Sequence, residues 1–270
     1  MAPEINIEPF KVDGGAGKES RYLITSPELN MKRLLASGLD KIFQLGPVFR
    51  KGERGDLHLP EFTLLEWYRK GADYSDLMKD CELLLKVSAA ALYGDTNQIP
   101  ISTKYLSLKP PFHIITVDDA FKKWAGWSPL ESCEPDRFDH DMVTLVEPML
   151  PRDKPVFLID YPAWQASLAR LSPRNKKVAE RVELYINGIE LANGFSELVD
   201  RHEQEERFKH ETEKMRRVGR ETYPQPCHFF TALDRLDECA GMALGVDRLI
   251  MVLTGADKID EVVAFTPEEC

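Results

Sequence analysis

Two strand-forming runs around a short polar segment constrain the fold most tightly. Ile42–Arg50 is predicted as one strand and Glu61–Arg69 as another, and the glycine-bearing segment Lys51–Pro60 joins them. Long strands with so short a connection pair as an antiparallel hairpin. The second strand alternates charged and aromatic residues with apolar ones, so charge is expected on one face of the resulting sheet.

The rest of the chain mixes helix and strand patterns without regular alternation. Helices are expected at Pro27–Ser37, Tyr74–Tyr93, Val117–Trp124, Asp141–Leu150, His202–Arg217 and Gly245–Leu253. Strands are expected at Val156–Asp160, Arg181–Ile189, Leu191–Leu198 and Val262–Phe265, and irregular segments at Thr96–Pro111 and Glu131–Arg137. This order predicts an α+β fold with an antiparallel β-sheet flanked by helices, rather than βαβ units. Without internal repeats, residues 1–270 are predicted to form a single domain.

Composition excludes several classes of protein. With 43% hydrophobic and 30% charged residues, the chain is neither collagenous nor disordered. No apolar run reaches the roughly 18–20 residues that span a bilayer, and Met1–Phe10 lacks the apolar core of a signal peptide. The five cysteines form no CxxC pair, which favours reduced thiols, a cytoplasmic location and no structural zinc.

The net charge of -10 argues against indiscriminate binding of phosphate backbones. Two basic stretches, Arg170–Arg181 and Lys214–Arg220, either dock an acidic partner or a tRNA acceptor stem, or are solvated faces. Asp13–Lys18 resembles a phosphate loop, but Val12 and Glu19 stand where that motif needs Gly and Ser or Thr. A turn is expected there instead.

Charge inside a sheet is costly unless it is paired or binds a ligand, so charged residues on the expected strands are informative. Arg50 ends an apolar strand, and His58 and Phe62 flank the same hairpin loop. A cation, a second donor and an aromatic ring suit a nucleotide. Glu66 and Tyr68 lie on the same strand face as Phe62; the alternative is a carboxylate that faces solvent.

Two further groups carry charge in the second half of the chain. A turn at Asn187–Gly188 is expected to bring Glu183 and Glu190 opposite each other, where a cation such as Mg²⁺ would relieve their repulsion. A solvated hairpin face explains this pair equally well. Arg248 lies in the first turn of an apolar helix, after the glycine-punctuated strand that begins at Gly241.

These segments together resemble the class II aminoacyl-tRNA synthetase core, in its lysyl branch. Val48–Arg50 with His58–Tyr68 resembles the second signature motif of that family, and Gly241–Leu249 resembles the third. Glu190–Leu198 resembles the segment between them that binds lysine and ATP. The resemblance covers nearly the whole chain and implies that it is an ATP-dependent, AMP-forming ligase.

The resemblance also implies a role for each motif residue. Arg50, Arg248 and Glu190 would act at the reacting phosphate, Phe62 would stack on adenine, and Glu183 would share Mg²⁺ with Glu190. The implied ATP-binding residues are Arg50, Glu53, His58, Leu59, Phe62, Glu183, Glu190, Leu191, Gly245 and Arg248. The implied amino-acid-binding residues are Ser26, Glu28, Glu66, Tyr68, Asn193, Phe195, Glu197 and Ala243.

Within the lysyl branch, the chain is more similar to the ligases that attach lysine or (R)-β-lysine to elongation factor P than to tRNA synthetases. Ser26 and Ala243 stand where synthetases tend to have Ala and Gly, and no anticodon-binding domain precedes the core. A tRNA ligase and a non-catalytic paralogue remain alternatives. The second motif of the family has Glu two residues after its Arg; here Gly52 occupies that position, and Glu53 comes one residue later. The first motif, which builds the family's dimer interface, is absent, so homodimerisation stays open.

Overall fold

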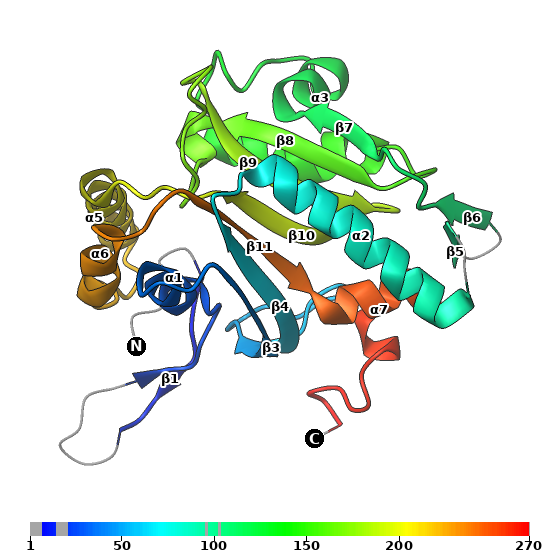
Figure 1. Ribbon diagram of the computed structural model, residues 1–270, viewed down its shortest axis with the longest axis horizontal. Helices are drawn as coiled ribbons and strands as arrows, with labels where there is room; N and C mark the ends of the chain where they lie inside the picture. The colour runs from blue at the N-terminus through cyan, green and yellow to red at the C-terminus, as the bar shows by residue number, and fades with distance from the viewer. Residues whose placement is uncertain (1–6, 15–20, 95–96, 102–103, 270) are drawn as a thin grey trace.

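A seven-stranded sheet forms the centre of the computed structural model, which describes residues 7–14, 21–94, 97–101 and 104–269 (Figure 1). Its strand order is β3-β4-β11-β10-β9-β8-β7. The strands are β3 (Lys41–Phe49), β4 (Glu61–Lys70), β7 (His113–Thr116), β8 (Val156–Pro162), β9 (Val178–Ile186), β10 (Ile189–Ser196) and β11 (Cys239–Gly245). All neighbours pair antiparallel except β7 and β8, which are parallel. The predicted α+β class is confirmed, with a mixed sheet instead of a purely antiparallel one.

Helices and two small ribbons surround this sheet. The helices are α1 (Glu28–Ala36), α2 (Tyr74–Tyr93), α3 (Val117–Trp124), α4 (Pro135–Asp141), α5 (Arg201–Arg217), α6 (Cys227–Leu233) and α7 (Val246–Thr254). Short π- and 3₁₀-helical turns occupy Met142–Val146, Glu147–Met149, Ala163–Gln165 and Ile259–Glu261. The ribbons are β1 (Lys11–Val12) with β2 (Arg21–Tyr22), and β5 (Gln98–Ile101) with β6 (Lys104–Ser107).

Several sequence-based predictions of local structure are wrong. The segment Thr96–Pro111 contains the ribbon β5–β6, since a proline is tolerated in a strand that has one partner only. Helix α4 begins inside the segment expected to be irregular, with Pro135 at a helix start, where its missing N–H costs nothing. Val262–Phe265 forms no strand, and Phe265 is 73% exposed. Most of the turn expected at Asp13–Lys18 lies outside the described residues.

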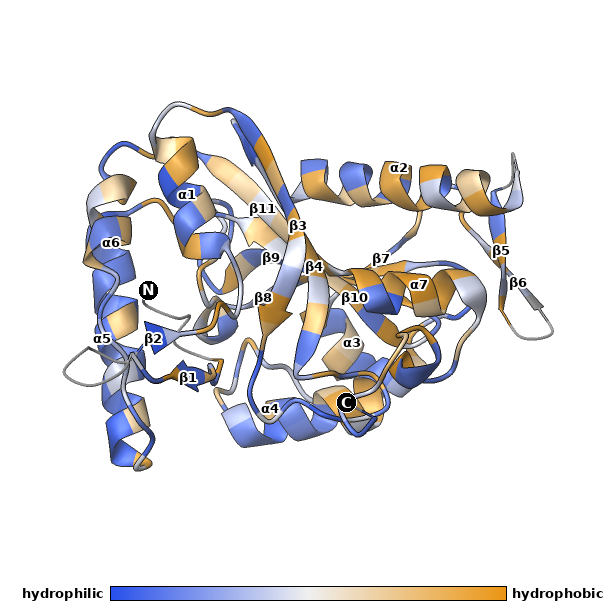
Figure 2. Cartoon of the chain, turned by 90° about the horizontal axis from the view of Figure 1, so that it is seen from below, coloured by the Kyte–Doolittle hydropathy of each residue, from blue (hydrophilic) through white to orange (hydrophobic). Residues whose placement is uncertain are grey.

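Strand alternation gives the sheet one apolar face. Leu65, Leu184 and Met242 project from β4, β9 and β11 into a continuous core. Helix α2 covers this face, with Leu77, Cys81, Leu85 and Ala89 buried at a four-residue spacing. Figure 1 shows α2 lying across the strands, and Figure 2 shows how hydrophilic and hydrophobic residues alternate along it.

The opposite face carries the polar residues. At one end α1, α5 and α6 enclose it, and Tyr68 packs in the cluster that they form. At the other end α3 and α4 pack over Leu158, Tyr161 and Tyr185. Between these two clusters the sheet floor is left accessible. Within the described residues, no helix combines the length and apolar character needed to cross a membrane.

Two glycines allow close packing where β10 and β11 run side by side, Gly241 on the polar face and Gly194 on the apolar face. A Cβ atom added at Gly241 would lie 2.1 Å from Cε1 of Tyr68 and 2.8 Å from Oε1 of Glu197. One added at Gly194 would lie 2.6 Å from the carbonyl oxygen of Gly241. Both positions therefore require glycine for steric reasons.

We predict that Gly241→Ala lowers the free energy of unfolding by about 1–3 kcal/mol, because the methyl group overpacks the Tyr68 ring. Gly46→Ala on β3 is the matched control, since an added Cβ there meets nothing within 4 Å. Urea denaturation of both variants measures the difference. Equal stability of the two would contradict this packing.

Candidate active site

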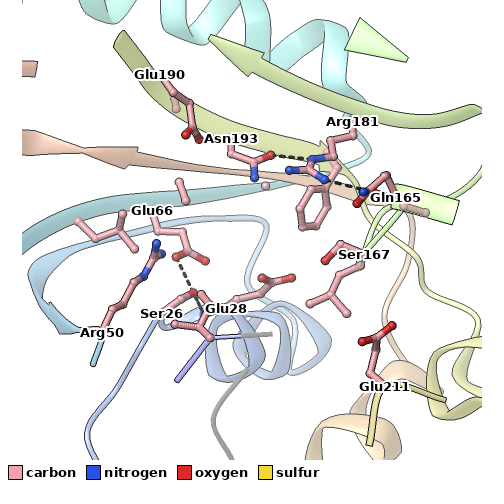
Figure 3. A pocket seen from close by; sticks show the side chains of 18 of the residues that line it. Ser26, Glu28, Arg50, Glu66, Gln165, Ser167, Arg181, Glu190, Asn193 and Glu211 are labelled. Atoms are coloured by element: carbon pink, nitrogen blue, oxygen red, sulfur yellow. Dashed lines mark hydrogen bonds between the residues drawn. The ribbon is translucent and has the colours of Figure 1, made fainter. Parts of the chain in front are cut away.

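A cavity of about 1460 Å³ lies over the polar face of the sheet. Figure 3 shows that its side chains come from α1, α5 and the central strands and converge on one space. The predicted site residues that line it are Ser26, Glu28, Arg50, Glu53, His58, Leu59, Phe62, Glu66, Tyr68, Glu190, Leu191, Asn193, Phe195, Ala243, Gly245 and Arg248. The remaining two, Glu183 and Glu197, are buried beneath the lining.

Arg50 marks one end of this cavity. Its guanidinium carbon lies 5.0 Å from the centroid of the Phe62 ring, and its Nε donates to the carbonyl oxygen of Thr25 at 3.4 Å. Gly52 adopts a φ of +81°, and the turn brings Glu53 Oε2 to 4.0 Å from Arg50 Nη1. The carboxylate that follows Gly52 thus reaches the arginine despite its shifted position in the sequence.

Arg248 enters the same end from the first turn of α7. Its Nε donates to the carbonyl oxygen of Leu57 at 3.1 Å, and its Nη1 donates to that of Glu190 at 2.8 Å. Its Nη2 lies 2.6 Å from Nε2 of His58. Burial and the charge of Arg248 lower the pKa of His58, so the imidazole favours its neutral form. Two fixed guanidinium groups therefore face one cavity from elements far apart in the sequence.

The hairpin β9–β10 positions the acidic residues differently from the prediction. Its two-residue turn pairs Ile186 with Ile189, so that Glu190 lies opposite Tyr185 rather than opposite Glu183. A bulge after Glu190 then places Glu183 opposite Asn193. Because alternate residues share a face, both carboxylates still lie on the polar side of the sheet.

The two carboxylates have different surroundings. Glu183 accepts hydrogen bonds from the hydroxyl groups of Tyr161 and Tyr185, and from Arg181 at 2.7 Å. Glu190 faces the cavity with its side chain 40% exposed. Partial burial at the cavity wall and the nearby charge of Glu183 raise the pKa of Glu190 to about 7, although Arg248 at 3.6 Å opposes the rise. Among the described residues, no group of three or more His, Cys, Asp or Glu side chains is arranged to hold a metal ion.

At the end of the cavity beside α1, several carboxylates gather. Glu66 is 1% exposed and accepts hydrogen bonds from Ser26 Oγ at 2.9 Å and from the Tyr68 hydroxyl at 2.6 Å. Figure 3 shows Glu28 and Glu66 near each other at this end. Glu197 lies behind them, 2% exposed.

Sequence reasoning missed two cations of the site. Lys32 contacts Glu28 and Glu197; its signal was the four-residue spacing from Glu28 on the buried side of α1. Arg181 was assigned to a basic stretch on the surface, but it lines the cavity. Its alternation with Glu183 along β9 places both side chains on the polar face, and that pattern could have revealed it.

Arg181 connects several elements of the site (Figure 3). Its Nε lies 3.3 Å from Asn193 Oδ1, and its Nη1 donates to the carbonyl oxygen of Gln165 at 3.1 Å. The guanidinium carbon lies 4.4 Å from the centroid of the Tyr161 ring. Because Arg181 engages the amide oxygen, the amide NH₂ of Asn193 is available as a donor.

We predict that the free energy of unfolding falls as pH rises from about 4.5 to about 7. In that range Glu190 keeps its proton in the folded protein and loses it in the unfolded chain. Solvent contact of the side chain reduces the size of the effect. Glu190→Gln should lose this slope, whereas Glu131→Gln at an exposed site should keep it. Denaturation across this pH range measures both, and an unchanged slope in Glu190→Gln would contradict the prediction.

The chain is similar to known proteins over nearly its whole length. Residues 3–269 match the family model described as tRNA synthetases class II (D, K and N). The elongation factor P--(R)-beta-lysine ligase of Vibrio cholerae is 39% identical over 273 residues, which is 97% of this chain and 84% of the relative. The ligase of the same name from Pectobacterium carotovorum is 42% identical over 280 residues, 98% of this chain and 84% of the relative.

Proposed function

Because this chain belongs to the class II tRNA synthetase family (D, K and N), we propose that it is an ATP-dependent ligase acting on elongation factor P. It activates lysine or (R)-β-lysine as an aminoacyl-adenylate and transfers the acyl group to a lysine side chain of that protein. One observation carries the proposal: a single cavity is lined by fixed guanidinium groups and, beside α1, by buried carboxylates. That arrangement complements a triphosphate lying beside a diamino acid.

The guanidinium end suits ATP. Arg50 binds the α-phosphate and the amino-acid carboxylate, and the Phe62 ring beside it stacks on adenine. Backbone of Leu59 and Leu191 forms the rim of the adenine site. A Cβ at Gly245 would make only ordinary contacts with Arg248, the nearest at 3.7 Å, so the space above this glycine is left for the nucleotide.

Arg248 and His58, which contact each other, bind the terminal phosphates. A divalent cation accompanying the nucleotide would neutralise phosphate charge there. Glu190 is the carboxylate that would hold it at the cavity wall. Glu183 stands behind Glu190, and its oxygens already accept hydrogen bonds from Tyr161, Tyr185 and Arg181. Phosphate and water oxygens would therefore complete the coordination of Mg²⁺.

The chemistry needs no protein nucleophile. A carboxylate oxygen of the amino acid attacks the α-phosphorus, and the bond to pyrophosphate breaks. The neutral amine of the acceptor lysine then attacks the acyl carbonyl, AMP leaves, and the amine loses a proton. The contribution of the protein is in-line positioning and positive charge beside the reacting phosphate, supplied by Arg50 and Arg248.

We predict that Arg50→Ala abolishes ATP–pyrophosphate exchange that depends on lysine or (R)-β-lysine, since the charge facing the α-phosphate is lost. Lys51→Ala is the matched control. Lys51 is the neighbouring cation, but its Nζ pairs with Glu8 at a distance of 2.6 Å, and it does not line the cavity. Exchange at the wild-type rate in Arg50→Ala would refute the assignment. No exchange in the wild type with any lysine isomer would favour a non-catalytic paralogue instead.

Ala243 is proposed to set the choice between lysine isomers. It lies opposite Glu66 in the β4–β11 register and lines the carboxylate end of the cavity. We predict that Ala243→Gly shifts the kcat/KM ratio toward α-lysine by roughly 10-fold, as one methyl group at a packed contact allows. Ala240→Gly, on the same strand but facing the apolar core, should leave the ratio unchanged. An unaltered ratio in Ala243→Gly would exclude this role.

A tRNA-charging ligase is the second candidate, and the acceptor distinguishes the two. Radiolabelled lysine or (R)-β-lysine is supplied with ATP and either tRNA or elongation factor P. Label on elongation factor P supports the proposal, and label on tRNA alone supports the alternative.

We further propose that the protein is cytoplasmic and that residues 1–270 form a single domain. The exposed Phe43 and Leu45 on the edge strand β3 favour a homodimer.

A further inference from the structure

The hairpin loop Lys51–Pro60 carries two residues of the proposed nucleotide site, Glu53 and His58, between the strands β3 and β4. Gly55 and His58 pair within the loop, where each backbone amide donates to the carbonyl oxygen of the other residue, at 3.0 and 3.2 Å. A segment outside regular secondary structure opens locally at little cost. Contacts from outside the loop therefore decide how firmly His58 is held.

One of these contacts comes from the C-terminal segment Lys258–Glu269. Arg54 Nε and Nη2 donate to the two carboxylate oxygens of Glu268, each at 2.9 Å. Nη2 also donates to Asp260 at 2.9 Å. Two parallel N–H···O bonds between a guanidinium and a carboxylate give a strong and directional contact. Arg54 thus joins the loop to a segment that lies 206 to 214 residues later in the sequence.

Backbone and apolar contacts join the same two segments. The amide of Ile259 donates to the carbonyl oxygen of Asp56 at 2.8 Å. The Ile259 side chain, 2% exposed, packs with Leu59 and Met251 and lines the cavity. The C-terminal segment therefore contacts the loop close to the proposed nucleotide site.

Arg54 is placed to act on the loop and not on a ligand, since neither Arg54 nor Glu268 lines the cavity. Isolated ion pairs on a surface contribute little, but bidentate geometry and a third charged group are the conditions under which they do contribute. The hydrogen bonds from Arg54 lower the pKa of Glu268 to about 2, so this carboxylate is ionised at neutral pH. Asp260 depends on Arg54 too, because its second oxygen, Oδ1, is buried with no hydrogen-bond partner among the described residues.

We propose that Arg54 is a positioning residue: it ties the hairpin loop to the C-terminal segment and so holds His58 beside Arg248, where the terminal phosphates of the nucleotide bind. Arg54 Nη1 donates to the carbonyl oxygen of Gly55 at 3.2 Å, which links Arg54 directly to the residue that pairs with His58. A loop that is already in its binding conformation lowers the cost of ordering when the ligand arrives. The inference rests on the proposed function for the identity of the ligand, but not for the contact between the loop and the segment.

The first test needs no ligand and follows the exchange of backbone amide hydrogens for deuterium. Arg54→Ala and Glu268→Gln weaken the contact from opposite sides. Both should speed amide exchange at Gly55 and His58 by about 5-fold, the size expected when a bidentate ion pair on the surface is lost. Amides of the central strands should exchange as in the wild type, because the change is confined to the loop.

Two further variants serve as controls. Arg201 also bridges two carboxylates, those of Glu205 and Asp234 at 2.7 Å, but it neither belongs to the loop nor lines the cavity. Arg201→Ala should therefore behave like the wild type in both tests. Arg54→Lys keeps the positive charge without the two-point geometry, and it should recover part of the loss seen in Arg54→Ala.

The second test measures ATP–pyrophosphate exchange with lysine or (R)-β-lysine in the same variants. Arg54→Ala and Glu268→Gln should raise the KM for ATP about 5-fold and leave kcat and the KM for the amino acid unchanged. Glu28, Glu66 and Asn193, proposed to bind the amino acid, lie outside the loop. A protein that is only less stable would lose active molecules, which lowers kcat and leaves the KM for ATP as it was.

The outcomes separate the claims. Wild-type amide exchange at Gly55 and His58 in both variants would show that Arg54 does not hold the loop. A wild-type KM for ATP in both, or an equal rise in the KM for ATP and for the amino acid, would overturn the positioning role. Should the wild type catalyse no pyrophosphate exchange, the proposed function fails and the positioning role with it, while amide exchange still decides whether Arg54 holds the loop.

Discussion

Compensation of charge buried on one face of the sheet is the constraint on which the rest of the structure depends. Carboxylates in so dry a place would otherwise repel each other and destabilise the fold. Lys32 compensates Glu28 and Glu197, and Arg181 compensates Glu183. Each cation contacts a carboxylate directly, so the polar face is an ordered network around a cavity rather than a defect in the core.

The two-residue period of the strands makes this arrangement compatible with a stable core. Alternate residues of β4, β9, β10 and β11 point to opposite faces, and the apolar set is sealed under α2. The residues of the polar face are not needed for the apolar core, so their chemistry differs along the cavity: Arg248 lies in α7, and the carboxylates gather beside α1. One sheet thereby supplies both stability and an extended binding floor.

Much of this could be predicted from the sequence where patterns are long. The hairpin of β3 and β4 and the helix α2 follow from clear periodicity, and the motifs around Arg50 and Arg248 locate the cavity. Features decided by tertiary contacts or by very short elements escaped prediction. The four-residue strand β7 gives too brief a pattern to reveal parallel pairing. In the sequence, Lys32 resembles one half of an ordinary surface ion pair with Glu28; its second partner, Glu197, follows β10 and is brought close only by the fold.

A crystal structure of the protein with (R)-β-lysine and a non-hydrolysable ATP analogue tests the central claim most directly. We predict the α-phosphate beside Arg50, the adenine on Phe62 and the terminal ammonium group of the amino acid among the carboxylates near Glu66, with Lys32 still between Glu28 and Glu197. An amino acid bound with its ammonium groups away from those carboxylates, or a triphosphate outside the cavity, would contradict the account.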